Sequence, residues 1–315
     1  MFRKILIAVD GSSCSERAGR VGLAFAKKLG ATAVVTHVLK VPPAYWGLSA
    51  PSETMQRHAR AILEPWEELG RQMQLDLRTE PMHDDDIAEG IVYLANRSQC
   101  DLIVMGTHGR EGVSRMLLGS VAERVSRLAK IPVMLVRGDG QVEPSTGLFQ
   151  RILAPIDGSE AGRPAFELAD RLAEELEAEL QILHVIPPLP APVVGPYGTS
   201  MNAFNWENTL RAMEEEGVAL VENARKLART PKVKMALLKA QTRREAEVIV
   251  DFARDNQSDL IVMGTHGRTG LERLLLGSVA EGVSHHAPVP VLLVRPVPAA
   301  PNVDQAVAEE AHAGR

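Results

Sequence analysis

The stretch DLIVMGTHGREGVSRMLLGSVAERVS, residues Asp101–Ser126, decides the fold because the chain contains it twice. Its second copy, DLIVMGTHGRTGLERLLLGSVAEGVS, covers Asp259–Ser284, and 21 of the 26 aligned residues are identical. Each copy runs from a short apolar segment through a glycine-rich loop into an amphipathic segment, which is a pattern of strand, loop and helix. The sequence therefore predicts two copies of one structural unit.

The repeat extends to both ends of each copy. KILIAVDGS at Lys4–Ser12 matches RILAPIDGS at Arg151–Ser159, and IPVMLVR at Ile131–Arg137 matches VPVLLVR at Val289–Arg295. A chain of 315 residues also has the length of two ordinary domains. From these landmarks we predict a first domain over 1–138, a Gly- and Pro-containing linker over 139–149, a second domain over 150–297 and a flexible tail over 298–315.

Each copy alternates strand and helix patterns. In the first copy we expect strands over 4–9, 31–39, 74–79, 101–106 and 131–136, and helices over 15–29, the later part of 42–70, 87–95 and 119–129. Strands that are apolar throughout and separated by helices indicate a parallel sheet covered on both faces. We therefore predict an α/β fold of two tandem Rossmann-like domains, each a five-stranded parallel sheet flanked by helices. Ligands of such sheets bind outside the carboxyl ends of the strands.

Composition and charge exclude several classes of function. The net charge is −5 and aromatic residues make up 4% of the chain, so neither a basic field nor a stacking platform for nucleic acid is present. No apolar run reaches the length of a membrane span. Cys14 and Cys100 suggest neither a disulfide framework nor a zinc site, and they favour a cytosolic protein. The acidic run His83–Asp86 precedes a helix and is interpreted as its cap rather than as a metal site.

Two pairs of small residues in each repeat carry the main functional signal. In the first copy, Gly106 and Gly109 follow a strand, and Gly119-Ser120 directly precedes a helix. Glycines at a strand end let the backbone approach a ligand closely, and a helix start offers free N–H groups to an anion. Ser120 either caps that helix or donates its hydroxyl to a phosphate. The sequence predicts a phosphate cradle in each copy, with tight turns as the alternative for any one glycine.

These motifs resemble a known family. The openings VDGS and IDGS, the DLIVMGTHGR run, the LLGSVAE run and the closing PVMLVR and PVLLVR segments are similar to those of universal stress protein domains, and the chain resembles a tandem universal stress protein. Its glycine pattern is that of the family's ATP-binding branch. The resemblance implies five parallel strands per domain, with an adenine nucleotide bound between the strand ends and the glycine loops.

The resemblance also assigns phosphate contacts residue by residue. The cradle would consist of Gly106, Gly109, Gly119 and Ser120 in the first copy and of Gly264, Gly267, Gly277 and Ser278 in the second. The next backbone N–H in each helix would come from Val121 and Val279. One arginine of each loop would screen phosphate charge, either Arg110 or Arg115 in the first copy and either Arg268 or Arg273 in the second, with a solvated surface position as the alternative.

The nucleoside contacts follow in the same way. Asp10 and Asp157 would lie near the ribose or the adenine, with capping of the next turn as the alternative, and Ala8 and Pro155 would line the same floor. The backbone of Val38 and Val185 would meet the adenine edge, and Met105 and Met263 would pack near the base. His37 and His184 are interpreted as structural hydrogen-bonding groups, and His108 and His266 either as phosphate contacts or as solvent-facing loop residues.

No paired carboxylates, nucleophile elbow or HExxH motif stands out, so the sequence favours binding over turnover. We predict a cytosolic stress or signalling protein that binds ATP, alone or with Mg²⁺, in each domain. The resemblance implies that the domains pair through their last strands as a pseudo-dimer, with a homodimer of chains as a further assembly. No nucleic acid or membrane partner is expected. Two alternatives stay open: a slow ATPase or self-phosphorylating enzyme acting through Ser120 or Ser278, and a nucleotide-independent interaction module acting through Pro42–Gly70 and Pro187–Gly217.

Overall fold

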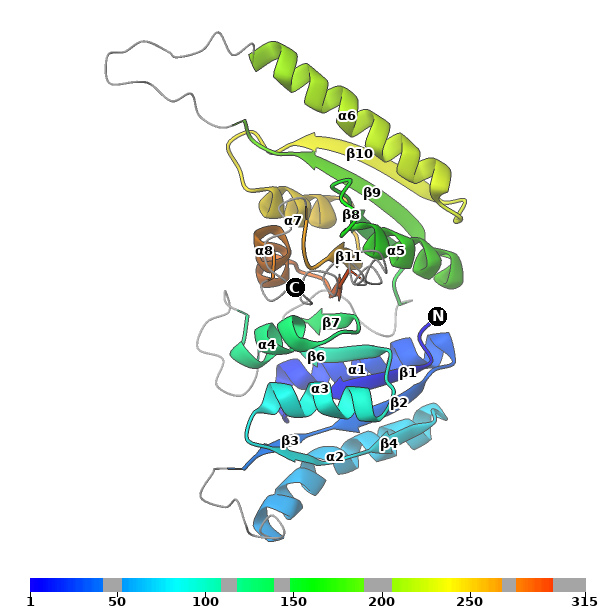
Figure 1. Cartoon of the computed structure of the whole chain (residues 1–315). Helices are drawn as coiled ribbons and strands as arrows, with labels where there is room; N and C mark the ends of the chain where they lie inside the picture. The colour runs from blue at the N-terminus through cyan, green and yellow to red at the C-terminus, as the bar shows by residue number, and fades with distance from the viewer. Residues whose placement is uncertain (42–52, 109–117, 139–147, 190–205, 268–275, 297–315) are drawn as a thin grey trace, which may run out of the picture.

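The computed structural model describes residues 1–41, 53–108, 118–138, 148–189, 206–267 and 276–296 (Figure 1). The first half contains, in chain order, β1 (Lys4–Ala8), α1 (Ser13–Leu29), β2 (Thr32–Thr36), β3 (Val38–Lys40), α2 (Glu53–Met73), β4 (Leu77–Thr79), β5 (Met82–Asp84), α3 (Ile87–Arg97), β6 (Leu102–Gly106), α4 (Ser120–Leu128) and β7 (Val133–Val136). The second half contains β8 (Arg151–Pro155), α5 (Arg163–Leu176), β9 (Glu179–Ile186), α6 (Trp206–Leu227), β10 (Val233–Lys239), α7 (Glu245–Asp255), β11 (Leu260–Gly264), α8 (Ser278–His286) and β12 (Val291–Val294).

Each half contains a parallel sheet of five strands, as the sequence predicted. The strand order is β4-β2-β1-β6-β7 in the first half and β10-β9-β8-β11-β12 in the second. Every pairing within each half is parallel. The direction in which strands are added reverses between β1 and β6, and again between β8 and β11. Such a switch point is where open α/β sheets hold ligands.

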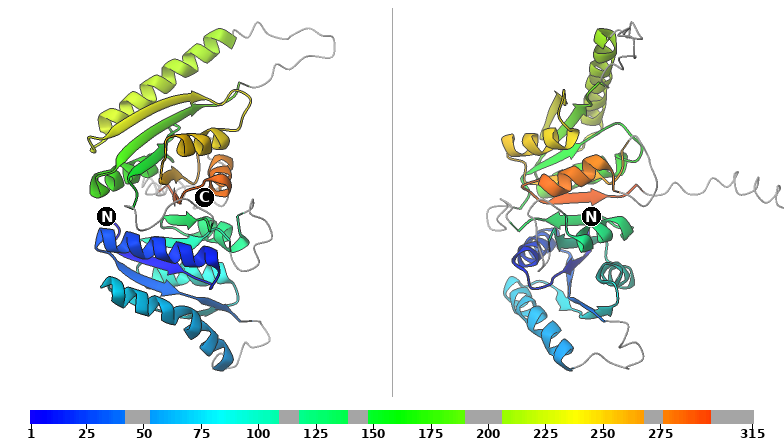
Figure 2. Two further views of the ribbon diagram at one scale, coloured as in Figure 1. Left: turned by 180° about the vertical axis from the view of Figure 1, so that it is seen from behind. Right: turned by 90° about the vertical axis from the view of Figure 1, so that its left-hand side faces the viewer.

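Helices cover both faces of the sheet (Figure 2), which explains why inner strands such as β1, β6, β7 and β12 are largely apolar, whereas the edge strands β4 and β10 carry charged residues. All five residues of β6 are buried, for example. Right-handed crossovers put α1 and α2 on one face and α3 and α4 on the other, and α3 packs against α4 as α7 packs against α8. Within the described ranges, none of the helices is long and apolar enough to cross a membrane.

The second strand of the first half is shorter than predicted. The pattern over 31–39 suggested one strand, but β2 ends at Thr36 and the chain continues after His37 as β3, which pairs with β5 in a separate two-stranded ribbon. Pro81 on the neighbouring strand explains the break, because proline has no backbone N–H to donate. The N–H groups on either side of it, of Glu80 and Met82, donate to the carbonyls of Val35 and His37, which lie before and after the break. In the second half β9 and β10 run on as single paired strands.

The last strands of the two halves pair with each other. β12 lies antiparallel to β7, with Leu292 opposite Met134 and Leu293 opposite Val133. The two sheets therefore form one sheet of ten strands (Figure 1). This pairing covers the apolar edge that each half would otherwise expose, and an exposed apolar edge favours aggregation.

The end of the predicted linker belongs to the core. Phe149 is completely buried, and its ring packs edge-on against Phe25 of α1 with centroids 5.3 Å apart. Phe25 in turn contacts Phe2 with centroids 6.1 Å apart. The chain therefore enters the second half from an anchored position beside α1.

Helices α1 and α3 have well-defined caps, and the predicted cap of α3 is confirmed. Gly30 ends α1 in the left-handed region, with φ +62°, and its N–H bonds to the last turn. Asp86 caps α3 by accepting a hydrogen bond from the N–H of Glu89 at 3.0 Å. The acidic run before α3 therefore starts a helix, and in the described part of the chain no three His, Cys, Asp or Glu side chains gather as metal ligands do.

The contact between α1 and α2 depends on a glycine. A Cβ on Gly19 would lie 2.2 Å from the ring of Trp66, which is itself buried. We expect Gly19→Ala to push this ring out of its site and to lower the free energy of unfolding by about 1–3 kcal/mol. Urea unfolding measures the loss, and Arg20→Ala on the exposed side of α1 is the control. Unchanged stability of Gly19→Ala would contradict this packing.

Candidate functional site

A cavity of about 380 Å³ lies in the second half at the switch point between β8 and β11. Its volume is in the range of small-molecule sites. The predicted residues on its wall are Pro155, Asp157, Val185, Met263, Gly264, Gly267, Gly277, Ser278 and Val279. Arg268, also predicted, lies outside the described residues. The sequence therefore located this cavity, although the roles of its residues remain predictions.

One end of the cavity is a helix start that is open to an anion. Gly277 is the N-cap of α8, which has no side-chain cap, and its own N–H donates to the carbonyl of Thr265 at 2.8 Å. The following N–H groups of the first turn have no partner inside the helix. A Cβ on Gly277 would lie 3.1 Å from that carbonyl, which explains why a glycine stands here. In the first half Gly119 holds the same place before α4, so the alternative that Ser120 caps this helix is wrong.

Asp157 has the capping role that was the alternative for it, while its contact with a nucleoside stays a prediction. Its Oδ1 accepts hydrogen bonds from the backbone N–H of Ser159 at 3.0 Å and from the Ser159 hydroxyl at 2.7 Å, so it caps the turn after β8. Its Oδ2 lies 2.7 Å from the position of a Cβ on Gly267, so the carboxylate also faces the glycine loop. Asp10 in the first half caps its turn in the same way, accepting from the N–H of Ser12 at 2.9 Å.

The histidines at the ends of the second strands have the structural role that was predicted. The Nδ1 atoms of His37 and His184 lie 2.8 Å from the carbonyls of Val9 and Ile156. These bonds tie the first and second strands of each half together beyond the ladder. His184 also lines the cavity, a contact that the sequence interpretation missed.

The loop histidines do not face solvent. Each Nδ1 lies 2.9 Å from the hydroxyl of the preceding threonine, in His108 and again in His266. Each Nε2 is buried, and no hydrogen-bond partner for it exists among the described residues. The solvent-facing alternative is therefore wrong, while a phosphate contact stays a prediction.

The cavity contains a carboxylate pair that sequence reasoning missed. Glu245, the first residue of α7, lines the same cavity as Asp157. Burial raises the pKa of Glu245, the negative charge of Asp157 adds to the effect, and His184 opposes it. The sequence interpretation did not bring these two residues together, because they are far apart in the chain. His266, which the sequence analysis weighed as a phosphate contact, also lines the cavity, and the missed wall residues are Ile156, Gly162, Leu183, His184, Pro187, Glu245, Ile249, Thr265 and Ala280.

The first half brings its predicted residues to the same place in the fold. Ala8 and Met105 are partners in the β1–β6 ladder, and Asp10 is the second residue after the end of β1. Gly106 ends β6, and Gly119, Ser120 and Val121 begin α4, where Gly119 N–H bonds to the carbonyl of Thr107 at 2.8 Å. Val38 belongs instead to the β3–β5 ribbon and packs against Gly90 of α3. Gly109, Arg110 and Arg115 lie outside the described residues, as does Arg273 of the second half.

The region at the start of α1 in the first half is more tightly filled than the corresponding region at the start of α5 in the second half. The thiol of Cys14 donates to the carbonyl of Val136 at 3.4 Å, and its Sγ lies 2.9 Å from the position of a Cβ on Gly106. Ser15, which corresponds to Gly162 in the second half, is buried and accepts a hydrogen bond from Asp10 N–H at 3.1 Å. Side chains therefore occupy in the first half a position where the second half has a glycine in its cavity wall.

The last helix of the second half approaches the glycine loop of the first. Arg137, just after β7, donates from Nη1 to the carbonyl of His285 at 2.6 Å. His285 also lies within electrostatic range of His108 in the first-half loop. Because β7 and β12 are antiparallel, α8 runs back from its own cavity toward the carboxyl ends of the first-half strands.

His285 should make the stability of this junction depend on pH. Burial lowers its pKa, His286 and His108 act in the same direction, and Glu281 and Glu123 oppose them. A lowered pKa means that the folded state takes up the proton less readily than the unfolded state. Stability is then lost as pH falls below the ordinary value near 6.5 toward the lowered one. We expect His285→Gln to lose less stability than the wild type between pH 7.5 and 5.5 in urea unfolding, with the exposed His286→Gln as control. Equal losses in the wild type and His285→Gln would contradict this.

The fold and the cavity define a class: tandem α/β domains whose glycine loops and helix starts meet at the switch point of a parallel sheet. The model of the universal stress protein family matches residues 1–137 and 148–295. The chain therefore belongs to the universal stress protein family, in its tandem form. It is 30% identical over 306 residues to a universal stress protein of Mycolicibacterium smegmatis, covering 93% of this chain and 97% of the relative. Universal stress protein Rv2005c of Mycobacterium tuberculosis is 28% identical over 300 residues, covering 92% of this chain and 96% of that protein.

Solved structures agree on the fold. A universal stress protein from Archaeoglobus fulgidus superposes with a TM-score of 0.63 at 22% identity, covering 93% of this chain and 98% of that one. A second structure, described as a putative universal stress protein from Pseudomonas aeruginosa, gives a TM-score of 0.62 at 18% identity over 100% of this chain and 98% of that one. At these identities the likeness concerns the fold alone.

Proposed function

We propose that this protein is a cytosolic regulator in stress response or signalling that binds one adenine nucleotide, ATP with Mg²⁺, in each half. The observation that carries the proposal is the cavity of about 380 Å³ bounded by parallel strand ends, a glycine loop and a glycine-capped helix start. Open backbone N–H groups and the helix dipole suit the phosphates. The apolar wall at Val185, Ile249 and Met263 suits a base.

The nucleotide would act as a ligand rather than as a fuel. ATP at 100 times its dissociation constant stabilises a folded domain by about 2.7 kcal/mol. A domain of this size then melts about 5–10 °C higher. We propose that the halves, joined through β7 and β12, act as an intramolecular pseudo-dimer whose surface responds to occupancy, and that chains pair further as a homodimer.

Identification of the bound molecule tests the proposal. The protein is purified without added nucleotide and denatured, and the released small molecules are identified by liquid chromatography and mass spectrometry. We expect up to two ATP or ADP per chain, and ADP formed from added ATP would support slow hydrolysis. A protein that is empty and shows no thermal shift with ATP and Mg²⁺ would overturn the proposal in favour of a nucleotide-independent interaction module.

A further inference from the structure

The two halves differ at one residue of the cavity wall. Counted back from the shared DLIVMG run, Glu245 corresponds to Ile87, and each is the first residue of its helix, α7 or α3. The repeat thus places a carboxylate in the second half where the first half has an apolar side chain.

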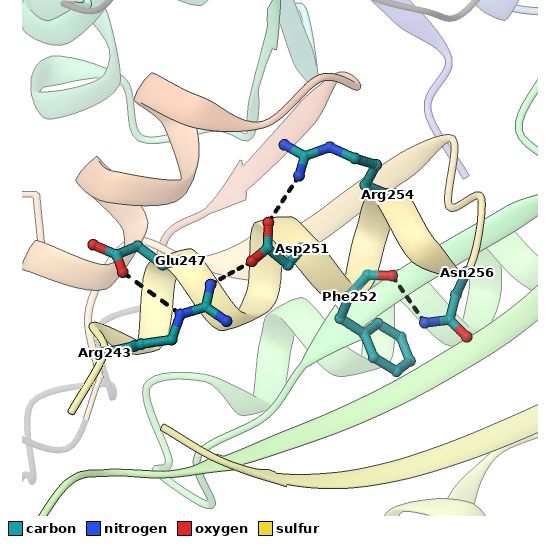
Figure 3. A network of polar contacts seen from close by, with 6 residues as sticks. All are labelled: Arg243, Glu247, Asp251, Phe252, Arg254 and Asn256. Atoms are coloured by element: carbon teal, nitrogen blue, oxygen red, sulfur yellow. Dashed lines mark hydrogen bonds and ion pairs between the residues drawn. The ribbon is translucent and has the colours of Figure 1, made fainter. Parts of the chain in front are cut away.

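The carboxylate of Glu245 has no partner of its own within the described part of the chain. It is half-buried, and no hydrogen bond or ion pair holds it there. The nearby Arg243 is directed along the outer face of α7, where it pairs with Glu247 and Asp251 (Figure 3). Asp251 also accepts from Arg254 at 2.8 Å, so the outer face is a closed network while Glu245 faces the cavity.

The chemistry of this position indicates what it meets. A carboxylate accepts hydrogen bonds, and leaving it unpaired in a partly desolvated cavity costs free energy. Phosphates carry no donors at neutral pH, so they suit the N–H groups at the start of α8, after Gly277, rather than a second anionic group. Beside Glu245 the wall is formed by Ile249, His184 and Val185, which suits the nucleoside. The donors of a nucleoside are its sugar hydroxyls and the exocyclic amino group of its base.

We propose that Glu245 is a specificity-determining residue of the second-half cavity, and that its carboxylate accepts a hydrogen bond from a donor of the bound nucleoside. This inference rests on the proposed function, since it assumes that the cavity holds a nucleotide. Ile87 offers no acceptor, so the first half does not make this distinction. The two halves therefore differ in their preference among nucleotides, although their glycine-loop sequences are nearly identical.

The test compares ligands that differ by one donor. The full chain carrying Gly119→Val, which fills the first-half loop, is titrated calorimetrically with ATP, 2′-deoxyATP, 3′-deoxyATP and purine riboside triphosphate, which lacks the amino group. We expect the analogue without the contacted donor to bind about 10- to 100-fold more weakly than ATP. The analogue that loses affinity identifies a hydroxyl or the amino group as the donor.

Variants of the carboxylate then assign the effect to Glu245. Glu245→Ile, the residue of the first half, should bind ATP as weakly as that analogue and leave the affinity of the analogue unchanged. Glu245→Gln keeps one acceptor oxygen and should keep part of the preference. Glu247→Gln, in the outer network of the same helix, is the matched control and should bind like the wild type. Melting without ligand checks that each variant is folded.

The outcomes separate this inference from the proposed function. If Glu245→Ile and the wild type show the same ratio of ATP affinity to analogue affinity for every analogue, the role of Glu245 is overturned and nucleotide binding stays in place. Absence of binding by every ligand, in the wild type as well, would overturn the proposed function and this inference with it. The reciprocal Ile87→Glu, in a chain carrying Gly277→Val, should transfer the preference to the first half.

Discussion

Gly277→Val is expected to lower nucleotide affinity at the second-half cavity by at least about 100-fold while leaving the fold intact. The backbone at Gly277 has φ −63° and ψ 146°, an extended conformation that valine adopts readily, so α8 still begins at Ser278. The added Cβ, however, would stand 3.1 Å from the carbonyl of Thr265, a backbone atom that cannot turn away. The branched side chain also fills the space in front of the open N–H groups.

The measurement is the nucleotide retained per chain together with its dissociation constant. Gly277→Val should lose one site, Gly119→Val the other, because a Cβ there would lie 3.0 Å from the carbonyl of Thr107. The double variant should retain none. A double variant with wild-type nucleotide content and unchanged affinity would show that the glycine-capped helix starts do not hold the ligand.

Leu292→Asp is expected to lower the free energy of unfolding by about 3 kcal/mol or more. Leu292 is completely inaccessible to solvent and lies opposite Met134 in the antiparallel pair of β12 and β7. A carboxylate at this place has no partner among the described residues and must either lose its hydration or take up a proton, and both are costly.

The control for this junction lies at the outer edge of the sheet. Leu238 on β10 is 36% exposed, so Leu238→Asp should cost less than 1 kcal/mol. Urea unfolding gives both values, and size-exclusion chromatography shows whether Leu292→Asp also exposes apolar strands and associates. Equal stability of the two variants would contradict the pairing of β7 with β12.

The sequence was most informative where the physical signal was local and repeated. The five strands of each half and the Asp86 cap follow from periodicity and from side-chain chemistry. The break after β2 was missed because it depends on Pro81, a residue distant in sequence that removes one donor from the neighbouring strand. The same limit applies to Phe149, whose place in a polar segment hid its burial against Phe25.

The candidate site was predictable in its loops and less so in its walls. The spacing of the glycines predicted that Gly264, Gly267 and Gly277 line the cavity, because positions with no room for a Cβ require glycine and are therefore visible in the sequence. Asp157 and Glu245 are 88 residues apart in the chain yet line the same cavity, and neither local sequence indicates this. The exchange of Ile87 for Glu245 between the aligned copies was the available signal.

The antiparallel junction of β7 and β12 makes the carboxyl ends of the strands in the two halves point in opposite directions. The carboxyl ends of β1 and β6 therefore lie on one side of the shared sheet, and those of β8 and β11 lie on the other side, at the opposite ends of the strands. Three strand spacings separate β6 from β11, which is about 14 Å across the sheet. A compact partner that binds at the carboxyl ends of the strands of one half consequently contacts the site of that half alone. Only a partner that extends around the sheet, or two partners bound on opposite sides, can contact both halves at once.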